Sequence, residues 1–536
     1  MAQQPAATPE PTFRTTTRLV QVNVVVHGRD KKPAEGLSKD DFTILEKGRP
    51  QKIAFFQMVR ANKIAAPASK LPQNIFSNHF GDKANVPSSV TVILLDSLNT
   101  EWSDQVYARM QVIKFLKQIQ PGDRVALYSL GRGLHILHDY TTDASALVER
   151  LGRFRGNNLP DLAASTVNTD DPLVQALSED GMANEQRMAN FFARNKVLNT
   201  LQALEAIGQH LASVPGRKSL VWVSGGFPLM IGFDDMDTAA SDGAPAAMQE
   251  RETFFDELEH TLRALNHADV AVYPVDARGL MVDPLFSAST RGSTARPKIW
   301  SPKYHDTMNV LADRTGGKAY YNRNDLDGAV REVFQDTAVT YTVGFYSDHP
   351  EMDGKFREIK VKVNKPGMNV RTRKGYFAFA DMKADDEKTI TSEIRNAVWS
   401  PLDATAVSVN ARVDRVGPGT GDTAQVVVQI DPTTTTLNQS GDRWIGRVDV
   451  AMVFKDEEAR PLMGSTETLS LNLTKDTYLK VLKTGILFRK SVPLPPKSRS
   501  LRIVVRDAPS GLSGSLTVPM STVALFVPPP PAKPKP

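Results

Sequence analysis

Val90-Thr91-Val92-Ile93-Leu94-Leu95-Asp96 is a continuous apolar run that ends in a carboxylate. Such a run is typical of a strand buried on both faces of a parallel sheet. Apolar residues then recur at helical spacing over residues 107–119, and a second strand is expected over 124–130. The tight turn at 131–133 leads directly into residues 134–138, so the sequence predicts a hairpin there.

The alternation of strands and helices continues to about residue 340. Further strands are expected at 218–224, 270–276 and 318–322, and further helices at 144–154, 190–211, 250–268, 305–315 and 326–339. Because strands that alternate with helices form parallel sheets covered on both faces, the sequence predicts an α/β fold. We expect a doubly wound, mostly parallel sheet of Rossmann type.

β-rich segments flank this region on both sides. Seven short strand-like runs between residues 404 and 527 predict an all-β sandwich, and one of these runs is 479–489. The predicted organisation is a disordered N-terminus at 1–12, a small β unit at 13–60, a linker at 61–86, the α/β domain at 87–340, a β extension at 341–380, a linker at 381–403, the sandwich at 404–527 and a Pro-rich tail at 528–536.

The composition excludes several classes of protein. The 536 residues include no cysteine, which excludes disulfides and thiolate metal sites, and the net charge of +5 is too diffuse for nucleic-acid binding. No stretch of about 18 apolar residues exists, so no transmembrane segment is predicted. The start at residues 1–7 is not a signal peptide as written, but it reads like the remainder of one after cleavage. We therefore expect an extracellular or periplasmic protein.

Several sequence blocks resemble a known family. They are residues 18–26, 94–100, 215–228, 311–320 with 324–326, and 371–377. In order and combination these blocks are similar to the von Willebrand factor A-related proteins common in Acidobacteria, over roughly residues 15–380. The resemblance implies a von Willebrand factor A-like fold for the α/β domain. A-type domains often bind Mg²⁺ or Mn²⁺ at the carboxyl end of the sheet, through a D-x-S-x-S turn and residues from two later loops.

The metal turn implied by this resemblance is incomplete here. Asp96 fits its first position and Thr100 its fifth, but Leu98 at the third position cannot ligate a cation. The later turn at Ser224 continues with two glycines and lacks its aspartate, and the middle loop offers only Thr166 and Thr169. One interpretation is a degenerate Mg²⁺ or Mn²⁺ site formed by Asp96, Thr100 and Ser224. The other is that Asp96 binds nearby backbone N–H groups or caps the following helix.

Four polar segments follow the predicted strands, at 97–104, 156–185, 226–249 and 278–302. In open α/β sheets ligands bind at the carboxyl ends of the strands, so these segments indicate a binding edge. We expect a secreted or cell-envelope protein-binding module that needs no cofactor, with a protein partner. Its expected contact residues are Asp96, Ser97, Asn99, Thr100, Ser224 and Asp276.

Two alternatives remain open at this stage. A metal-dependent hydrolase is disfavoured because no P-loop, G-x-S-x-G or H-E-x-x-H motif occurs and no acid/base pair is visible. A purely structural envelope component, in which the C-terminal sandwich matters most, would not use the sheet edge. If Asp96 is buried and fully engaged by its neighbours, it cannot be the centre of recognition.

Overall fold

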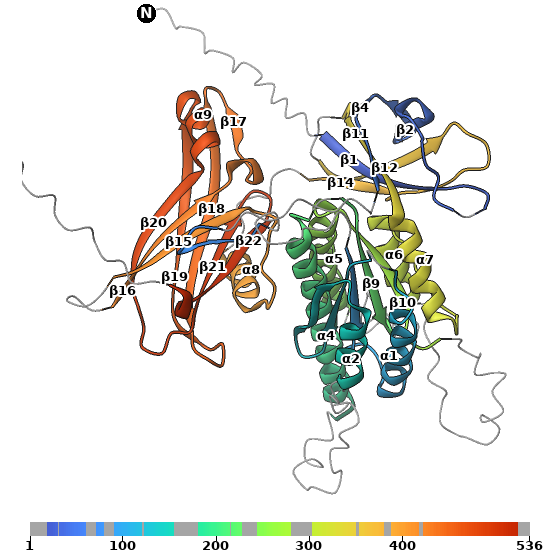
Figure 1. Ribbon diagram of the computed structural model, residues 1–536, viewed down its shortest axis with the longest axis horizontal. Helices are drawn as coiled ribbons and strands as arrows, with labels where there is room; N and C mark the ends of the chain where they lie inside the picture. Colours follow the sequence, from blue (N-terminus) through green and yellow to red (C-terminus); the bar gives the residue numbers. More distant parts are fainter. Residues whose placement is uncertain are drawn as a thin grey trace, which may run out of the picture.

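The computed structural model describes twelve stretches of the chain, and they form three bodies (Figure 1). We call these the α/β domain, the N-terminal β domain and the C-terminal β domain. The described residues are 19–30, 32–60, 71–79, 90–120, 123–154, 181–214, 216–227, 244–279, 303–349, 353–379, 387–416 and 422–523.

A five-stranded sheet organises the α/β domain, in the order β10-β9-β6-β7-β8. Its strands are β6 (Thr91–Asp96), β7 (Val125–Leu130), β8 (Leu134–Thr141), β9 (Lys218–Ser224) and β10 (Val270–Asp276). The predicted mostly parallel sheet is confirmed: only β8 runs antiparallel, as the second strand of the predicted hairpin. The chain winds in opposite directions from β6, so the carboxyl ends of β6 and β9 lie at the switch point where such sheets bind ligands.

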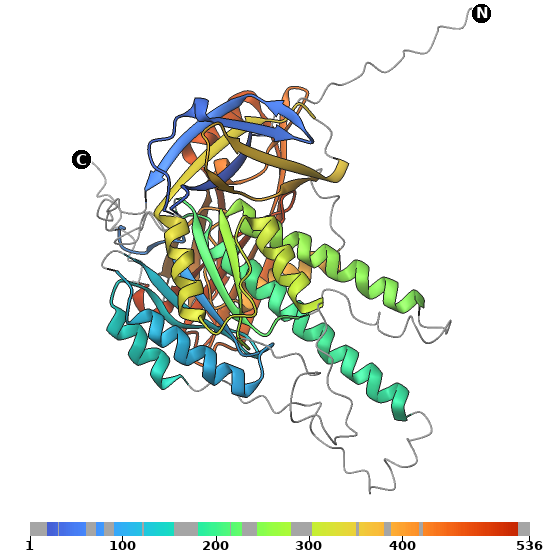
Figure 2. The ribbon, with the colours of Figure 1, turned by 90° about the vertical axis from the view of Figure 1, so that its right-hand side faces the viewer.

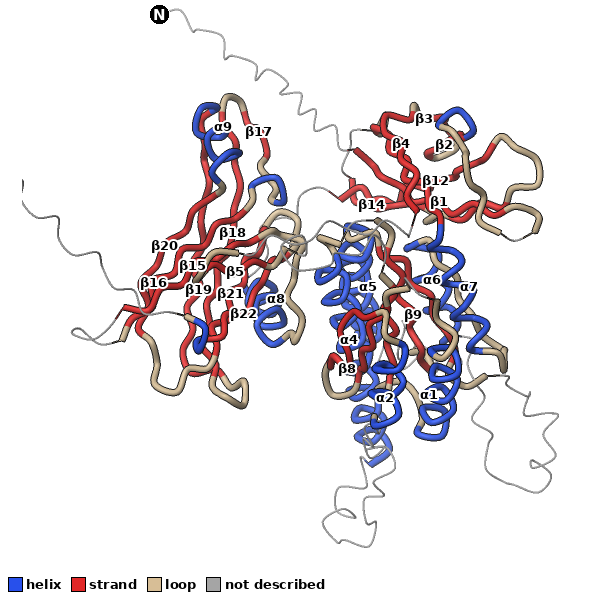
Figure 3. Tube along the Cα trace, viewed as in Figure 1, coloured by secondary structure: helices blue, strands red, loops and turns tan. Residues whose placement is uncertain are grey.

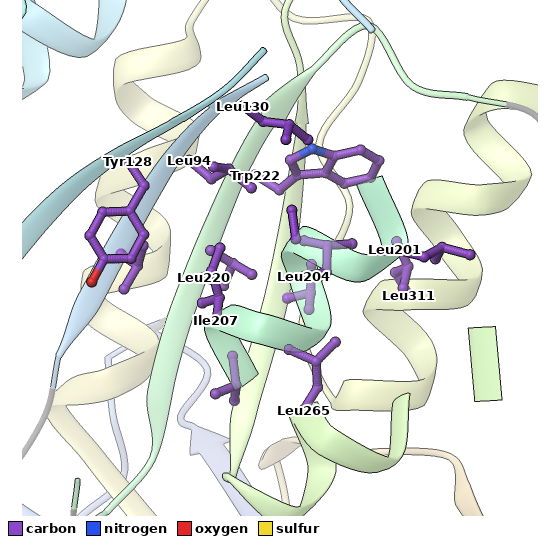
Figure 4. Close-up of a cluster of buried hydrophobic side chains, with 14 of the residues drawn as sticks. Leu94, Tyr128, Leu130, Leu201, Leu204, Ile207, Leu220, Trp222, Leu265 and Leu311 are labelled. Atoms are coloured by element: carbon purple, nitrogen blue, oxygen red, sulfur yellow. The ribbon is translucent and has the colours of Figure 1, made fainter. Parts of the chain in front are cut away.

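Helices cover both faces of this sheet, as expected for a doubly wound fold. On one face lie α4 (Gly181–Leu211), α5 (Ala244–His267) and α6 (Lys303–Thr315), and α4 and α5 run side by side (Figure 2). On the other lie α1 (Trp102–Leu116), α2 (Ala144–Arg153) and α7 (Leu326–Ala338). Figure 4 shows Leu201, Leu204 and Ile207 of α4 directed at the sheet side chains. The strand predicted at 318–322 is reduced to a single bridge, Val275 to Tyr320.

The N-terminal β domain combines segments from both sides of the α/β domain. Its strands are β1 (Leu19–His27), β2 (Phe42–Glu46), β3 (Arg49–Gln51), β4 (Ile53–Arg60), β11 (Val339–Tyr346), β12 (Asp353–Val363), β13 (Asn369–Arg371) and β14 (Gly375–Phe379). They form two sheets, β13-β1-β11-β4 and β14-β12-β2-β3, around one apolar core. The β unit predicted at 13–60 and the extension predicted at 341–380 therefore belong to one body.

The C-terminal β domain consists mainly of strands (Figure 3). Its elements are α8 (Glu387–Trp399), β15 (Val409–Val416), β16 (Thr423–Ile430), β17 (Asn438–Ser440), β18 (Arg443–Lys455), β19 (Pro461–Thr474), α9 (Lys475–Thr484), β20 (Ile486–Pro493), β21 (Ser500–Asp507) and β22 (Ser513–Pro519). Two sheets face one apolar core. The strand expected at 479–489 was wrong in its first half, because Thr474 caps a helix that Gly485 ends.

The segment predicted as a linker at 61–86 contains a strand of this C-terminal domain. β5 (Ile75–Ser77) pairs with β15, more than 300 residues later in the sequence. Next to it, the fully buried Asn78 donates to the carbonyl oxygens of Ala404 at 2.7 Å and Val407 at 2.8 Å, and its Oδ1 accepts from the Val409 N–H at 2.8 Å. One side chain thus fixes residues 71–79 to the C-terminal β domain.

Charged side chains meet where α4, α5 and α8 approach one another. Glu393 of α8 lies 3.5 Å from His260 of α5 and also pairs with the buried Arg506 of β21. Burial, together with the nearby carboxylates of Glu393 and Glu257, raises the pKa of Glu205 on α4 to about 8. The contact between the α/β domain and the C-terminal β domain therefore holds a carboxyl group that stays protonated near neutral pH.

Replacing Asn78 by Ala is expected to lower the free energy of unfolding by about 2–4 kcal/mol, because three buried backbone groups lose their partner. Urea unfolding measures the loss. Gln73→Ala is the control, since Gln73 is exposed in the same segment. Equal unfolding midpoints for both variants would contradict the anchoring role.

Replacing Glu205 by Gln is expected to change the pH dependence of stability. The folded chain keeps a proton up to about pH 8, which the unfolded chain releases near its ordinary pKa of 4.5, so wild-type stability falls as pH rises through this window. The neutral Gln lacks this dependence. Unfolding midpoints should match near pH 4, and the variant should exceed wild type near pH 9. Glu149→Gln, at an exposed position on α2, should leave the wild-type profile unchanged.

Candidate functional site

Asp96 ends β6 at the switch point and is only 2% exposed. Its Oδ1 accepts from the backbone N–H groups of Leu98 and Asn99, both at 3.0 Å. Its Oδ2 accepts from Asn99 Nδ2 at 2.8 Å, Trp222 Nε1 at 3.0 Å and Ser224 Oγ at 2.7 Å. Five donors therefore surround one carboxylate. This agrees with the second interpretation given above, in which Asp96 binds nearby backbone N–H groups.

Two opposing effects set the charge of this carboxylate. Burial raises the pKa of Asp96, whereas the hydrogen bonds from Asn99, Ser224 and Trp222 lower it; burial is the larger effect and the net shift is upward. Trp222 is completely buried between the sheet and α4, with its indole near Leu201 (Figure 4). The carboxylate thus joins β6 to the neighbouring strand β9 at the carboxyl edge of the sheet.

The turns after β6 and β9 interlock. Thr100 Oγ1 accepts from the Gly225 N–H at 3.0 Å, and Ser224 Oγ accepts from the Gly226 N–H at 2.9 Å. A Cβ on Gly225 would come within 2.4 Å of the Asn99 carbonyl oxygen, so only glycine allows this approach. Asn99 also donates to Thr200 Oγ1 at 2.8 Å, which ties the turn to α4.

The residues at this turn do not fit a Mg²⁺ or Mn²⁺ ion. A hard cation needs free oxygen ligands, but both oxygens of Asp96 and the hydroxyls of Thr100 and Ser224 are engaged within the protein. The indole N–H of Trp222, a donor that cannot ligate a cation, points at Asp96, and Leu98 holds the third position. Within the described ranges, no group of three His, Asp or Glu side chains is arranged for a metal.

Asp276 ends β10, and β9 lies between it and Asp96. Its side chain is completely buried and accepts from Arg278 through Nε at 2.7 Å and Nη2 at 2.6 Å. His305 Nε2 lies 3.1 Å from the same carboxylate, and the His305 ring stacks on Tyr321 with 4.3 Å between centroids. Arg278 thus gives the buried carboxylate a full counter-charge.

Most of the predicted contact residues lie beneath the surface. Asp96, Ser97, Thr100, Ser224 and Asp276 are all at most 8% exposed, and only Asn99 is half-buried. The structure brings Asp96, Asn99, Thr100 and Ser224 together, but as a buried hydrogen-bonded network. The expectation that they form an exposed contact surface is corrected by their burial. Thr166, Thr169 and most of the segments 156–185, 226–249 and 278–302 lie outside the described residues.

Other side chains at this edge reach solvent, and the sequence analysis did not select them. Trp102, in the first turn of α1, is 47% exposed, and Tyr321 is 37% exposed. Trp102 borders a small pocket with Ser97, Gln105 and Phe154. The pocket has about 30 Å³ of free space, enough to hold a water molecule, and among the described residues the buried Gln105 Oε1 atom has no hydrogen-bond partner. The signal in the sequence that could have identified Trp102 was a large aromatic residue at the start of a helix, close after a strand end.

Replacing Ser224 by Ala is expected to lower the free energy of unfolding by about 1–3 kcal/mol, because Asp96 loses a donor and the Gly226 N–H loses its acceptor. Ser219→Ala is a matched control on the same strand: Ser219 is equally buried, but its hydroxyl makes no hydrogen bond with any described residue. Urea unfolding of both variants measures the difference. Equal losses would show that the Asp96 network contributes nothing specific.

Comparisons with known proteins give distant likenesses. No protein-family model and no curated protein matches the chain. An aerotolerance-related membrane protein from Bacteroides fragilis is 12% identical, with 46% of this chain and 98% of that chain covered and a TM-score of 0.25. BatB from Bacteroides thetaiotaomicron is 9% identical, with 46% of this chain and 97% of that chain covered and a TM-score of 0.24. A von Willebrand factor type A protein from Catenulispora acidiphila is 9% identical, with 65% of this chain and 80% of that chain covered and a TM-score of 0.23. Identities and TM-scores this low transfer no function to this chain.

Proposed function

We propose that this chain is a non-enzymatic, secreted or cell-envelope interaction module of the von Willebrand factor A type, which binds a protein partner at the carboxyl edge of its sheet. The sequence blocks that resemble this family support the proposal, as does the doubly wound sheet with its switch point at β6 and β9. In this proposal the C-terminal β domain is a sandwich that serves as a spacer or a secondary contact.

The observation that carries the proposal is the exposed indole of Trp102, held on a rigid support. Trp102 follows the turn that Asp96, Thr100 and Gly225 fix in place. Tryptophan is enriched among the residues that dominate protein interfaces, and a rigid support lowers the entropy lost on binding. Trp102 therefore takes the contact role first assigned to Asp96, which instead shapes the turn.

The proposed contact does not depend on a metal ion. The oxygens that would bind a cation through Asp96, Thr100 and Ser224 already have partners inside the protein. In this proposal Trp102 is the main contact, together with the half-buried Asn99 of the preceding turn and the exposed Tyr321. A partner that buries the indole against the small pocket gains apolar contact area without a coordination bond.

The burial of Asp96 favours one alternative, a structural envelope component that makes no contact through the sheet edge. An enzyme has less support. A substrate pocket typically encloses at least about 300 Å³, far more than the hollow beside Trp102. The binding hypothesis and the structural hypothesis predict different results for a variant in which the exposed Trp102 is replaced.

Trp102→Ala is expected to reduce capture of a partner from the native envelope fraction roughly tenfold or more, because a central interface tryptophan is lost. Quantitative pull-down with the full chain measures the bound partner, and capture should persist in EDTA. Met110→Ala, at a position that is 62% exposed further along α1, is the matched control. If the wild type, Trp102→Ala and Met110→Ala capture the partner equally, the structural alternative is favoured. If capture is lost only in EDTA, the metal interpretation is restored.

A further inference from the structure

Helix α9 lies at one end of the C-terminal β domain, beside β17 (Figure 1). Its main neighbours are β18, β19 and the short 3-10 helix Pro432–Thr434, all within the same domain. The helix has no fully buried residue. One side of α9 is therefore attached to the domain and the other faces solvent.

The attached side is held by specific contacts. The Tyr478 ring stacks on Trp444 of β18 with 4.6 Å between centroids and 6° between planes, and Val481 packs against the apolar core. At the end of the helix, Gln429 Nε2 donates to the Thr484 carbonyl at 2.9 Å. These contacts fix the orientation of α9 and therefore the side chains that it presents.

The presented side alternates leucine and lysine. Leu479 is 48% exposed and Leu482 is 38% exposed, and Leu487 at the start of β20 is 46% exposed. The lysines of α9 are all exposed, and in the described part of the chain none of them forms an ion pair with a carboxylate: Lys475, Lys480 and Lys483. At 100° per residue, Lys475, Leu479, Leu482 and Lys483 share one side of the helix. We call these four residues, with Lys480 and Leu487, the tip surface.

The composition of the tip surface distinguishes between two kinds of occupant. Protein interfaces are depleted in lysine, and leucine is under-represented among their dominant residues. A lipid surface suits both residue types, because leucines enter the boundary between headgroups and acyl chains while lysine stems extend to the headgroups. Three lysines against the single Asp476 select an anionic surface.

We propose that the tip surface docks the C-terminal β domain onto a lipid bilayer that contains anionic headgroups. The leucines of α9 insert at the interface, and the lysines bind the phosphate groups around them. Because α9 is anchored through Tyr478 and Trp444, the domain lies against the bilayer in one orientation. None of the described helices is long and apolar enough to cross a membrane. The proposal is independent of the partner site at the sheet edge.

Vesicle co-sedimentation of the full chain tests the proposal. The protein is expected to sediment with vesicles of phosphatidylglycerol and phosphatidylcholine, and to stay in solution with pure phosphatidylcholine. The combined variant Lys475→Gln, Lys480→Gln, Lys483→Gln should bind anionic vesicles about a hundredfold more weakly, since each lysine near such a surface contributes roughly a fivefold gain in affinity. Leu479→Ser with Leu482→Ser should also weaken binding at least tenfold.

A matched control separates the tip surface from overall charge. Lys52→Gln, Lys360→Gln and Lys362→Gln remove the same charge from exposed positions of the N-terminal β domain and should bind like wild type. Circular dichroism and urea unfolding confirm that all variants fold. No sedimentation with anionic vesicles, equal binding to neutral vesicles, or binding that the tip variants do not weaken would each overturn the proposal; the first result would leave an acidic protein as the occupant to examine.

Discussion

The α/β domain depends on how one buried carboxylate is satisfied. An ionised side chain inside a core is costly unless donors replace the water that it loses, and Asp96 receives five of them from β9 and the turn between β6 and α1. Each donor also restrains the element from which it comes. The same hydrogen bonds that keep the carboxylate in the core therefore set the positions of β9, of the glycine turn that follows it, and of the start of α1.

This network explains why the described residues at the edge of the sheet offer few free ligands for a cation. In a cation-binding turn the carboxylate faces outward and coordinates the ion with water. Here the Trp222 indole lies on the core side and the carboxylate turns toward it. The polar groups of this turn form hydrogen bonds inside the protein, and the side chains that can contact a partner are those that follow the turn.

The sequence was sufficient for the sheet and its helices because both depend on local periodicity. The apolar run at 90–96, the hairpin after β7 and the helices on both faces follow from spacing alone. The position of Asp96 at a strand end was predictable as well, whereas its burial was not, because the burial depends on Trp222, which lies 126 residues further along the chain. Likewise, β5 is only three residues long, and nothing local in residues 61–86 shows that β15 will pair with it. Helix α9 was mistaken in part for a strand because its leucines and valine also suit a β run.

The route of the chain through its three bodies has a consequence for biosynthesis. β1 pairs with β11, and Asn78 binds a carbonyl 329 residues later, so neither β domain can close while the ribosome is still making the central sheet. Strands β1 and β5 must wait, with their edges open, until sequence far downstream emerges. Contacts of such large sequence separation make folding slow. A chain exported in an unfolded state would escape this order of events, since both halves of each β domain would then be present before either could begin to pair.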